Sequence, residues 1–89
     1  IPQRMALLPN YPNPFNPETT LKYMLSVEGL VNLSIYDITG KLIHTLVNET
    51  QFIGTHQVTW DANNLPSGMY ISRLLVAGET YTRKMILMK

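Results

Sequence analysis

The residues of this 89-residue chain that could do chemistry are two histidines, six carboxylates and a few hydroxyl groups. A metal site would need His44 and His56 to converge with a third ligand such as Asp37 or Asp61, and their spacing does not support this. Calcium could instead use the two aspartates and the asparagine-rich loops, because it accepts carboxylates, amides and carbonyls. The simpler interpretation is that the histidines lie in strands and the aspartates stabilise turns.

The arrangement of the carboxylates, serines and tyrosines gives little support to catalysis or sugar binding. A glycosidase needs two carboxylates facing each other at about 5–10 Å across a cleft, whereas the carboxylates here mostly fall at strand ends and turns. No serine carries a nucleophile elbow or a Gly-rich oxyanion loop. A sugar-binding face would need coplanar exposed aromatics, which Tyr36, Tyr70 and Tyr81 could supply, although the first two are equally good core residues. We expect no enzyme activity, no metal and no cofactor.

The amino-acid composition excludes further classes of function. The net charge is +1, from 7 basic and 6 acidic residues, so nothing suggests an electrostatic footprint for nucleic acid. No apolar run approaches the roughly 18 residues that span a bilayer, and the absence of cysteine excludes disulfides. We expect one domain over residues 1–89, with residues 1–9 as a linker or first edge strand. Because Ile1 opens the chain without a Met or a signal peptide, we interpret it as a module excised from a longer protein.

Short strands are the elements that must position these residues. Apolar and polar residues alternate from Thr19 onward, as in half-buried strands, and no window keeps a helical period. Six strands are predicted, over residues 19–27, 31–36, 41–48, 56–62, 69–77 and 80–88. An edge strand over Arg4–Leu8 would be the seventh. Tight turns are predicted at Asp37–Lys41 and at Gly78-Glu79. This pattern is typical of an all-β fold, an antiparallel immunoglobulin-like or fibronectin-like β-sandwich of about seven strands, with Trp60 as core anchor.

Residues 1–18 contain five of the six prolines. Each proline fixes its own φ, lacks an N–H and pushes the preceding residue out of the helical region. We therefore expect a rigid, polyproline-like strip whose large side chains, Tyr11 and Phe15, anchor it to one end of the core. A second apolar pair that looks buried is Phe52-Ile53, in the polar loop before the strand at 56–62.

The terminal strand is unusually apolar, since Arg83, Lys84 and Lys89 bracket the run Met85–Met88. One interpretation is a core-facing strand with solubilising charges at its flanks. The other is a strand whose edge or terminus docks into a partner by β-augmentation. The residues alone leave both open. Because an unprotected apolar edge strand risks aggregation, we expect a partner or a cap.

Six motifs, in order, carry a resemblance that covers the chain from about Leu8 to Lys89. The motifs are Tyr11-Pro-Asn-Pro-Phe-Asn-Pro17, Thr20-Leu-Lys-Tyr23, Ile35-Tyr-Asp-Ile-Thr-Gly-Lys41, Gly54-Thr-His-Gln-Val-Thr-Trp-Asp61, Ser67-Gly-Met-Tyr70 and Arg83-Lys-Met-Ile-Leu-Met-Lys89. Together they resemble the type A C-terminal sorting domain of the type IX (Por) secretion system.

The resemblance implies a non-catalytic β-sandwich at the carboxyl end of an exported bacterial protein. Such a domain directs an N-terminal cargo domain of the same chain from the periplasm through the outer-membrane translocon to the cell surface. A sortase-like cysteine peptidase then commonly removes it and can attach the cargo to surface lipopolysaccharide. Carried over by position, the implied recognition residues are Asn13, Pro14, Phe15, Asn16, Pro17, Asp37, Gly40, Gly68, Tyr70, Arg83, Lys84 and Lys89.

Two departures keep alternatives open. Family tails often show two lysines where this chain has Arg83-Lys84, which keeps the charge and changes the donor geometry. A related sandwich in flagellar hook-capping proteins shares much of the pattern, so fold alone does not establish a sorting role. The alternatives are a structural spacer or adhesion module and an accessory carbohydrate-binding module of a secreted hydrolase.

Overall fold

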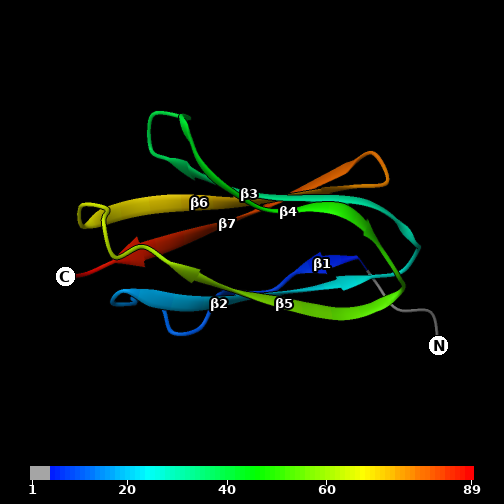
Figure 1. Cartoon of the computed structure of the whole chain (residues 1–89), viewed down its shortest axis with the longest axis horizontal. Helices are drawn as coiled ribbons and strands as arrows, with labels where there is room; N and C mark the ends of the chain where they lie inside the picture. The colour runs from blue at the N-terminus through cyan, green and yellow to red at the C-terminus, as the bar shows by residue number, and fades with distance from the viewer. Residues whose placement is uncertain (1–4) are drawn as a thin grey trace.

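Seven strands form two antiparallel sheets that face each other in the computed structural model, which describes residues 5–89 (Figure 1). One sheet has the order β1-β2-β5 and the other has the order β4-β3-β6-β7. The strands are β1 (Ala6–Leu7), β2 (Glu18–Leu25), β3 (Gly29–Asp37), β4 (Leu42–Gln51), β5 (Gly54–Asp61), β6 (Gly68–Val76) and β7 (Glu79–Leu87). The predicted antiparallel β-sandwich of about seven strands is confirmed. The expected first strand is present at Ala6–Leu7, while Arg4 lies outside the described residues.

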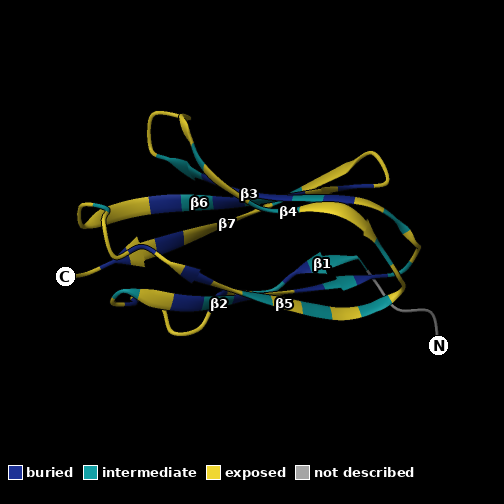
Figure 2. Cartoon of the chain, viewed as in Figure 1, coloured by how far each residue is buried: buried dark blue, intermediate teal, exposed yellow. Residues whose placement is uncertain are grey.

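The core lies between the two sheets, where buried residues alternate with more exposed ones along β2 and β6, whereas β4 has no fully buried residue (Figure 2). In β2 the inward positions begin at Thr19 and continue with Leu21, Tyr23 and Leu25, while the residues between them face outward. This follows from the two-residue period of a strand. Trp60 of β5 is only 2% exposed, which confirms it as a core anchor.

Two hairpins belong to the four-stranded sheet. In the turn from β3 to β4, Gly40 has a φ of +89°, a conformation that only glycine adopts without a steric penalty. The turn from β6 to β7 consists of Ala77 and Gly78, with φ of 52° and 75°, because Val76 pairs with Glu79. Positive φ at both central residues is the type I′ geometry. The predicted turn at Gly78-Glu79 was therefore one residue too late.

Three apolar residues predicted to be buried are exposed. Phe52 and Ile53 are 74% and 60% exposed, since they form the connection from β4 in one sheet to β5 in the other. Tyr11 is 80% exposed. Its backbone pairs with Thr20, an outward-facing position of β2, and directly opposed residues of an antiparallel pair share one face. The prediction that Tyr11 anchors the core was wrong.

Strand bounds differ from the prediction by a few residues. β2 ends at Leu25, so Val27 lies in the crossing to the other sheet and is exposed. β4 continues to Gln51, three residues beyond its predicted end. No helix long and apolar enough to cross a membrane is found between residues 5 and 89.

Candidate recognition surface

The proline-rich segment Asn10–Pro17, here called the strap, joins the β1 side of the three-stranded sheet to the free edge of β7 in the other sheet. Its first part lies on β2, where the Tyr11 N–H donates to the Thr20 carbonyl at 3.0 Å and the Thr20 N–H donates back at 2.9 Å. Its second part lies on β7, where Phe15 forms a parallel bridge with Leu87. The strap therefore closes one side of the sandwich.

The strap is not the extended strip that its prolines predicted. It bends after Tyr11 and again after Phe15, because the chain must pass from the edge of one sheet to the edge of the other within a few residues. An extended segment would have continued along a single edge. Three of its peptide bonds are cis, those of Tyr11-Pro12, Asn13-Pro14 and Asn16-Pro17.

The strap also covers part of the free edge of β7. The Phe15 N–H donates to the Ile86 carbonyl at 2.9 Å, and the Met88 N–H donates to the Phe15 carbonyl at 3.0 Å. The Asn13 side chain fills the neighbouring positions: Oδ1 accepts from the Ile86 N–H at 3.0 Å, and Nδ2 donates to the Lys84 carbonyl at 3.4 Å. The cap expected for an apolar edge strand is thus supplied here by the chain itself.

Three hydrogen bonds that hold the strap were missed by the sequence prediction. Asn10 is buried, and its Nδ2 donates to the Thr19 hydroxyl at 2.9 Å and to the Pro12 carbonyl at 3.2 Å. The Thr19 hydroxyl donates to the same Pro12 carbonyl at 2.8 Å. The available signal is that Thr19 occupies an inward position of a strand, where a buried hydroxyl requires a partner.

An aromatic cluster supports the strap from inside. The ring of Phe15 lies 5.7 Å from that of Trp60, and the Trp60 ring lies 5.6 Å from that of Tyr70, centroid to centroid. The Trp60 indole N–H donates to His44 Nδ1 at 3.0 Å, and the Tyr70 hydroxyl donates to the Pro66 carbonyl at 2.7 Å. Burial raises the pKa of Tyr70, and the Asp37 carboxylate raises it further. The cluster fixes the place of Phe15 and Tyr70, which are scaffold residues of this surface.

Asp37 organises the turn after β3. Its Oδ1 accepts from the Thr39 N–H at 2.9 Å, the Thr39 hydroxyl at 2.6 Å and the Lys41 N–H at 3.0 Å. These hydrogen bonds, the Thr39 hydroxyl above all, lower the pKa of Asp37. The simpler interpretation of Asp37 as a turn residue is therefore confirmed, with Gly40 providing the positive φ.

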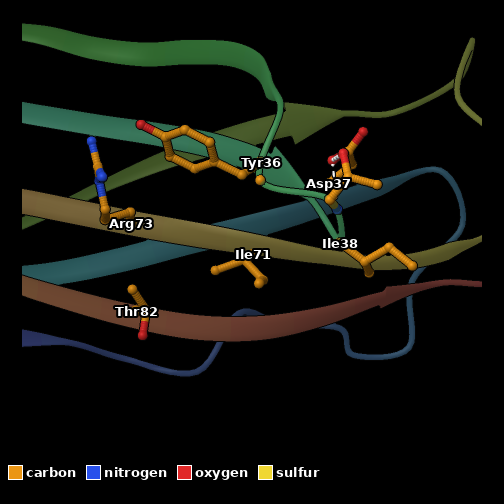
Figure 3. Close-up of a pocket in the computed structure, with 8 residues that line it drawn as sticks. Tyr36, Asp37, Ile38, Ile71, Arg73 and Thr82 are labelled. Carbon is orange, nitrogen blue, oxygen red and sulfur yellow. Dashed lines mark hydrogen bonds between the residues drawn. The ribbon is translucent and has the colours of Figure 1, made fainter.

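The same turn borders two surface hollows. One, of about 250 Å³, lies between the turn and the segment Leu65–Tyr70. The other, of about 380 Å³, lies on the outer face of the four-stranded sheet (Figure 3). There the Arg73 guanidinium lies beside the Tyr36 ring, 4.8 Å from its centroid. Both hollows are shallow depressions over side chains that the sheet already holds in place.

The C-terminal residue lies against the turn that precedes β6. The Lys89 N–H donates to the Ser67 hydroxyl at 3.0 Å, and its ammonium group donates to the Asn63 carbonyl. Gly68 begins β6 directly after this turn. The structure therefore gathers most of the predicted recognition residues at one end of the sandwich. We call this end the terminal end; it comprises the strap, the Asp37–Gly40 turn, Leu65–Tyr70 and Lys89.

Two predicted residues lie away from the terminal end. Arg83 points across the sandwich, where its Nε donates to the Leu7 carbonyl of β1 at 2.7 Å. Lys84 is exposed on the outer face of the four-stranded sheet, in register with Ile71. Arg83 is thus a bridge between the two sheets, whereas the exposed Lys84 side chain has no hydrogen-bond partner among residues 5–89.

This geometry has a counterpart among known families. A family model described as the secretion system C-terminal sorting domain matches residues 10–88, from the first residue of the strap to Met88. The chain belongs to this family. The sorting domain is thus a C-terminal sorting signal of type IX secretion, as its motifs predicted. No curated protein and no solved structure matches the chain.

The last strand of the sorting domain and the residue after it carry both buried and exposed apolar side chains. Met85 and Leu87 are fully buried, while Ile86 and Met88 are 41% and 58% exposed. The core-facing interpretation of the tail is confirmed for the first pair. The second pair lies beside the strap on the outer face.

The side chains considered for other chemistry do not gather in the sorting domain. His44 belongs to β4 and His56 to β5, in different sheets, and no three metal-ligating side chains lie together within residues 5–89. Tyr36 faces outward from its sheet, Tyr70 is buried, and Tyr81 is half-buried against the core. These three tyrosines therefore form no common platform for a sugar ring.

Proposed function

We propose that this sorting domain acts as a folded export signal that the outer-membrane translocon of the type IX system recognises. A cargo domain N-terminal to it in the same chain would travel from the periplasm to the cell surface. There a sortase-like peptidase would remove the domain and attach the cargo to a surface lipid. The observation that supports this proposal is the family match over residues 10–88, which spans every strand except β1.

The structure divides the implied recognition residues into two groups. Phe15 and Tyr70 are buried, and Asn13 and Asp37 are engaged in backbone hydrogen bonds. These residues shape the surface, since their contacts lie within the domain. The ammonium groups of Lys84 and Lys89 are exposed, and that of Lys89 keeps donors to spare beside its bond to the Asn63 carbonyl. We propose that these two groups carry the contact with the partner.

Deleting Lys84–Lys89 would not test this proposal cleanly, because it removes Met85 and Leu87 from the core. Charge-neutral variants are sharper. A reporter fused to the domain is expressed in a bacterium with type IX secretion, as wild type, as Lys84→Gln with Lys89→Gln, and as Lys22→Gln with Lys41→Gln. The last pair is the control, since both lysines are exposed outside the tail, Lys22 in β2 and Lys41 directly after the Asp37–Gly40 turn, and the net charge change is the same.

We expect the tail pair to lower surface delivery of the reporter several-fold and the control pair to leave delivery intact. The thermal midpoint of the tail pair should stay close to that of the wild type, because the bond from Lys89 to the Asn63 carbonyl is exposed. Surface labelling of whole cells measures delivery, and unfolding of the purified domain measures stability. Equal delivery by both pairs contradicts the role of the tail lysines. If the wild-type fusion itself stays inside the cell, the export signal is contradicted.

A further inference from the structure

The free edge of β7 is covered over only half of its length. In an antiparallel pair, successive residues direct their backbone groups alternately toward and away from the partner strand. The bonds from Ile86 and Met88 to the strap establish that the even-numbered residues of β7 point away from β6. From the Lys84 carbonyl onward, this edge is bonded to Asn13 and Phe15. We call this stretch the closed half.

The other half of the edge is open. By the same alternation, the N–H and C=O groups of Thr80 and Thr82 and the N–H of Lys84 point outward. Within residues 5–89 none of these groups has a hydrogen-bond partner. The strap does not reach them, because the part of the strap before Asn13 lies on β2, where Tyr11 pairs with Thr20. We call this stretch the open half.

A groove runs beside the open half. It has a volume of about 380 Å³ and separates the edge of β7 from the edge of β1. Its floor is spanned by the hydrogen bond from Arg83 Nε to the Leu7 carbonyl. Both sheets therefore present an edge to this groove, which is lined by Met5, Ala6, Leu7 and residues 80–83.

We propose that the open half of β7 binds an extended segment of the export machinery by main-chain hydrogen bonds, in line with the strap. This inference rests on the proposed function and specifies its contact. The occupant is a polypeptide strand because only a strand offers alternating donors and acceptors at this spacing. The closed half already holds such an occupant, since Phe15 is bound there through its own N–H and C=O.

The groove also sets a side-chain preference for the incoming segment. Residues that point inward would meet Met5 and Tyr81, which are both half-buried and packed against the core. Residues that point outward would meet Thr82 and the ammonium group of Lys84 on the outer face. The structure thus favours a segment with apolar residues on one face and polar or acidic residues on the other.

A proline at position 82 tests the backbone contact. Thr82→Pro removes one outward N–H and leaves the ladder to β6 intact, which is where edge strands tolerate proline. Thr59→Pro is the matched control. The bond from the Ala62 N–H to the Pro17 carbonyl shows that even-numbered residues of β5 face β2, so the Thr59 N–H also points outward, from a different edge. Thr82→Val changes the side chain at the test site and keeps its N–H.

The same reporter fusions and the thermal midpoints of the purified domains supply the readout. We expect Thr82→Pro to lower surface delivery several-fold, while Thr59→Pro and Thr82→Val deliver as wild type. Delivery by Thr82→Pro at the wild-type level overturns this inference alone and leaves the proposed function standing. Loss of delivery in Thr82→Val as well also overturns it, because the side chain and not the backbone is then being recognised.

A crosslink keeps the test valid if Thr82→Pro fails to fold. The photoreactive residue p-benzoylphenylalanine is placed at position 82 or, as control, at position 59 of the fusion. A product with a translocon component, identified by mass spectrometry, at position 82 and not at 59 supports the inference. No product, or equal products at both positions, overturns it. A wild-type fusion that is not exported removes the proposed function and this inference together.

Discussion

The closed and open halves of the β7 edge belong to one strand and differ in what lies beside them. The closed half is bonded to the strap and rests on the aromatic cluster of Phe15, Trp60 and Tyr70. The open half leads from the Ala77-Gly78 turn and borders a groove. An unpaired strand edge invites pairing with another chain. The domain thus protects the apolar part of its last strand and leaves the part that carries threonines accessible.

The comparison teaches that a sorting signal of this kind need not expose its most apolar residues. Met85 and Leu87 are buried, although they belong to the tail that the family motifs single out. The open half exposes backbone N–H and C=O groups, whose direction and spacing are fixed by the strand. The strap on the closed half holds the same strand in place.

The largest effect is expected from removing the support of the closed half. Trp60→Ala should lower the free energy of unfolding by about 3–5 kcal/mol, because a large buried ring leaves a cavity under the strap. Chemical denaturation of the purified domain measures this change. Phe52→Ala is the control, since Phe52 is 74% exposed, and it should stay within about 0.5 kcal/mol of wild type. A near-neutral Trp60→Ala would contradict the difference between the halves.

A smaller effect is expected from loosening the strap itself. Asn13→Ala removes both side-chain bonds to β7, and each exposed bond is worth about 0.5–1.5 kcal/mol. Amide hydrogen exchange should then become faster at Ile86 and Met88 and remain unchanged at Thr82. Asn16→Ala is the control, because its side chain is exposed and no hydrogen bond holds it within the described residues. Equal exchange at Ile86 in both variants would contradict closure by Asn13.

The open half begins at a turn that can be stabilised. Ala77 has a φ of 52°, a left-handed conformation that is unfavourable for a residue with a Cβ. Ala77→Gly should therefore raise the free energy of unfolding by up to about 1 kcal/mol, since the entropy lost by glycine offsets part of the gain. Gly78→Ala should have the opposite sign, since Gly78 has a φ of 75°. Urea midpoints of the two variants measure both changes.

The smallest effect concerns pH at the terminal end. Hydrogen bonds lower the pKa of Asp37 in the folded domain below its unfolded value. Its ionised form therefore stabilises the turn above the unfolded pKa, and this stabilisation is lost as pH falls from about 4 through the folded pKa. Asp37→Asn keeps an acceptor oxygen and does not titrate. The thermal midpoint of the wild type should fall more steeply in this range than that of the variant, and parallel curves would contradict the assignment.

Alternation in the sequence predicted the fold well because it reports which face of a strand is buried. It could not predict which strands pair, or that β2 and β3 lie in different sheets. The proline-rich segment shows the limit most clearly. Tyr11 and Phe15 are aromatics in the same proline-rich segment, yet one is 80% exposed and the other is buried. The difference is set by which sheet edge each backbone joins, and that depends on residues far along the chain.

The residues of the candidate surface were named by family motifs and not by chemistry, and their role in recognition stays a prediction. The motifs named Asn13, Phe15 and Lys84 without indicating that the first two hold the edge on which the third lies. Arg83 was expected to contact a partner, whereas its Nε bonds to β1. The open half itself has no motif, because unpaired backbone groups at positions 80 and 82 leave no mark in residue type.

The strap has a consequence for biosynthesis. Asn13 and Phe15 leave the ribosome some seventy residues before the partners they bond, Lys84, Ile86 and Met88. The strap cannot bind β7 until Lys84–Met88 has been synthesised. A polypeptide that ends before these residues lacks the strand edge to which the strap bonds. Binding of the strap to β7 therefore requires that translation of this region has been completed.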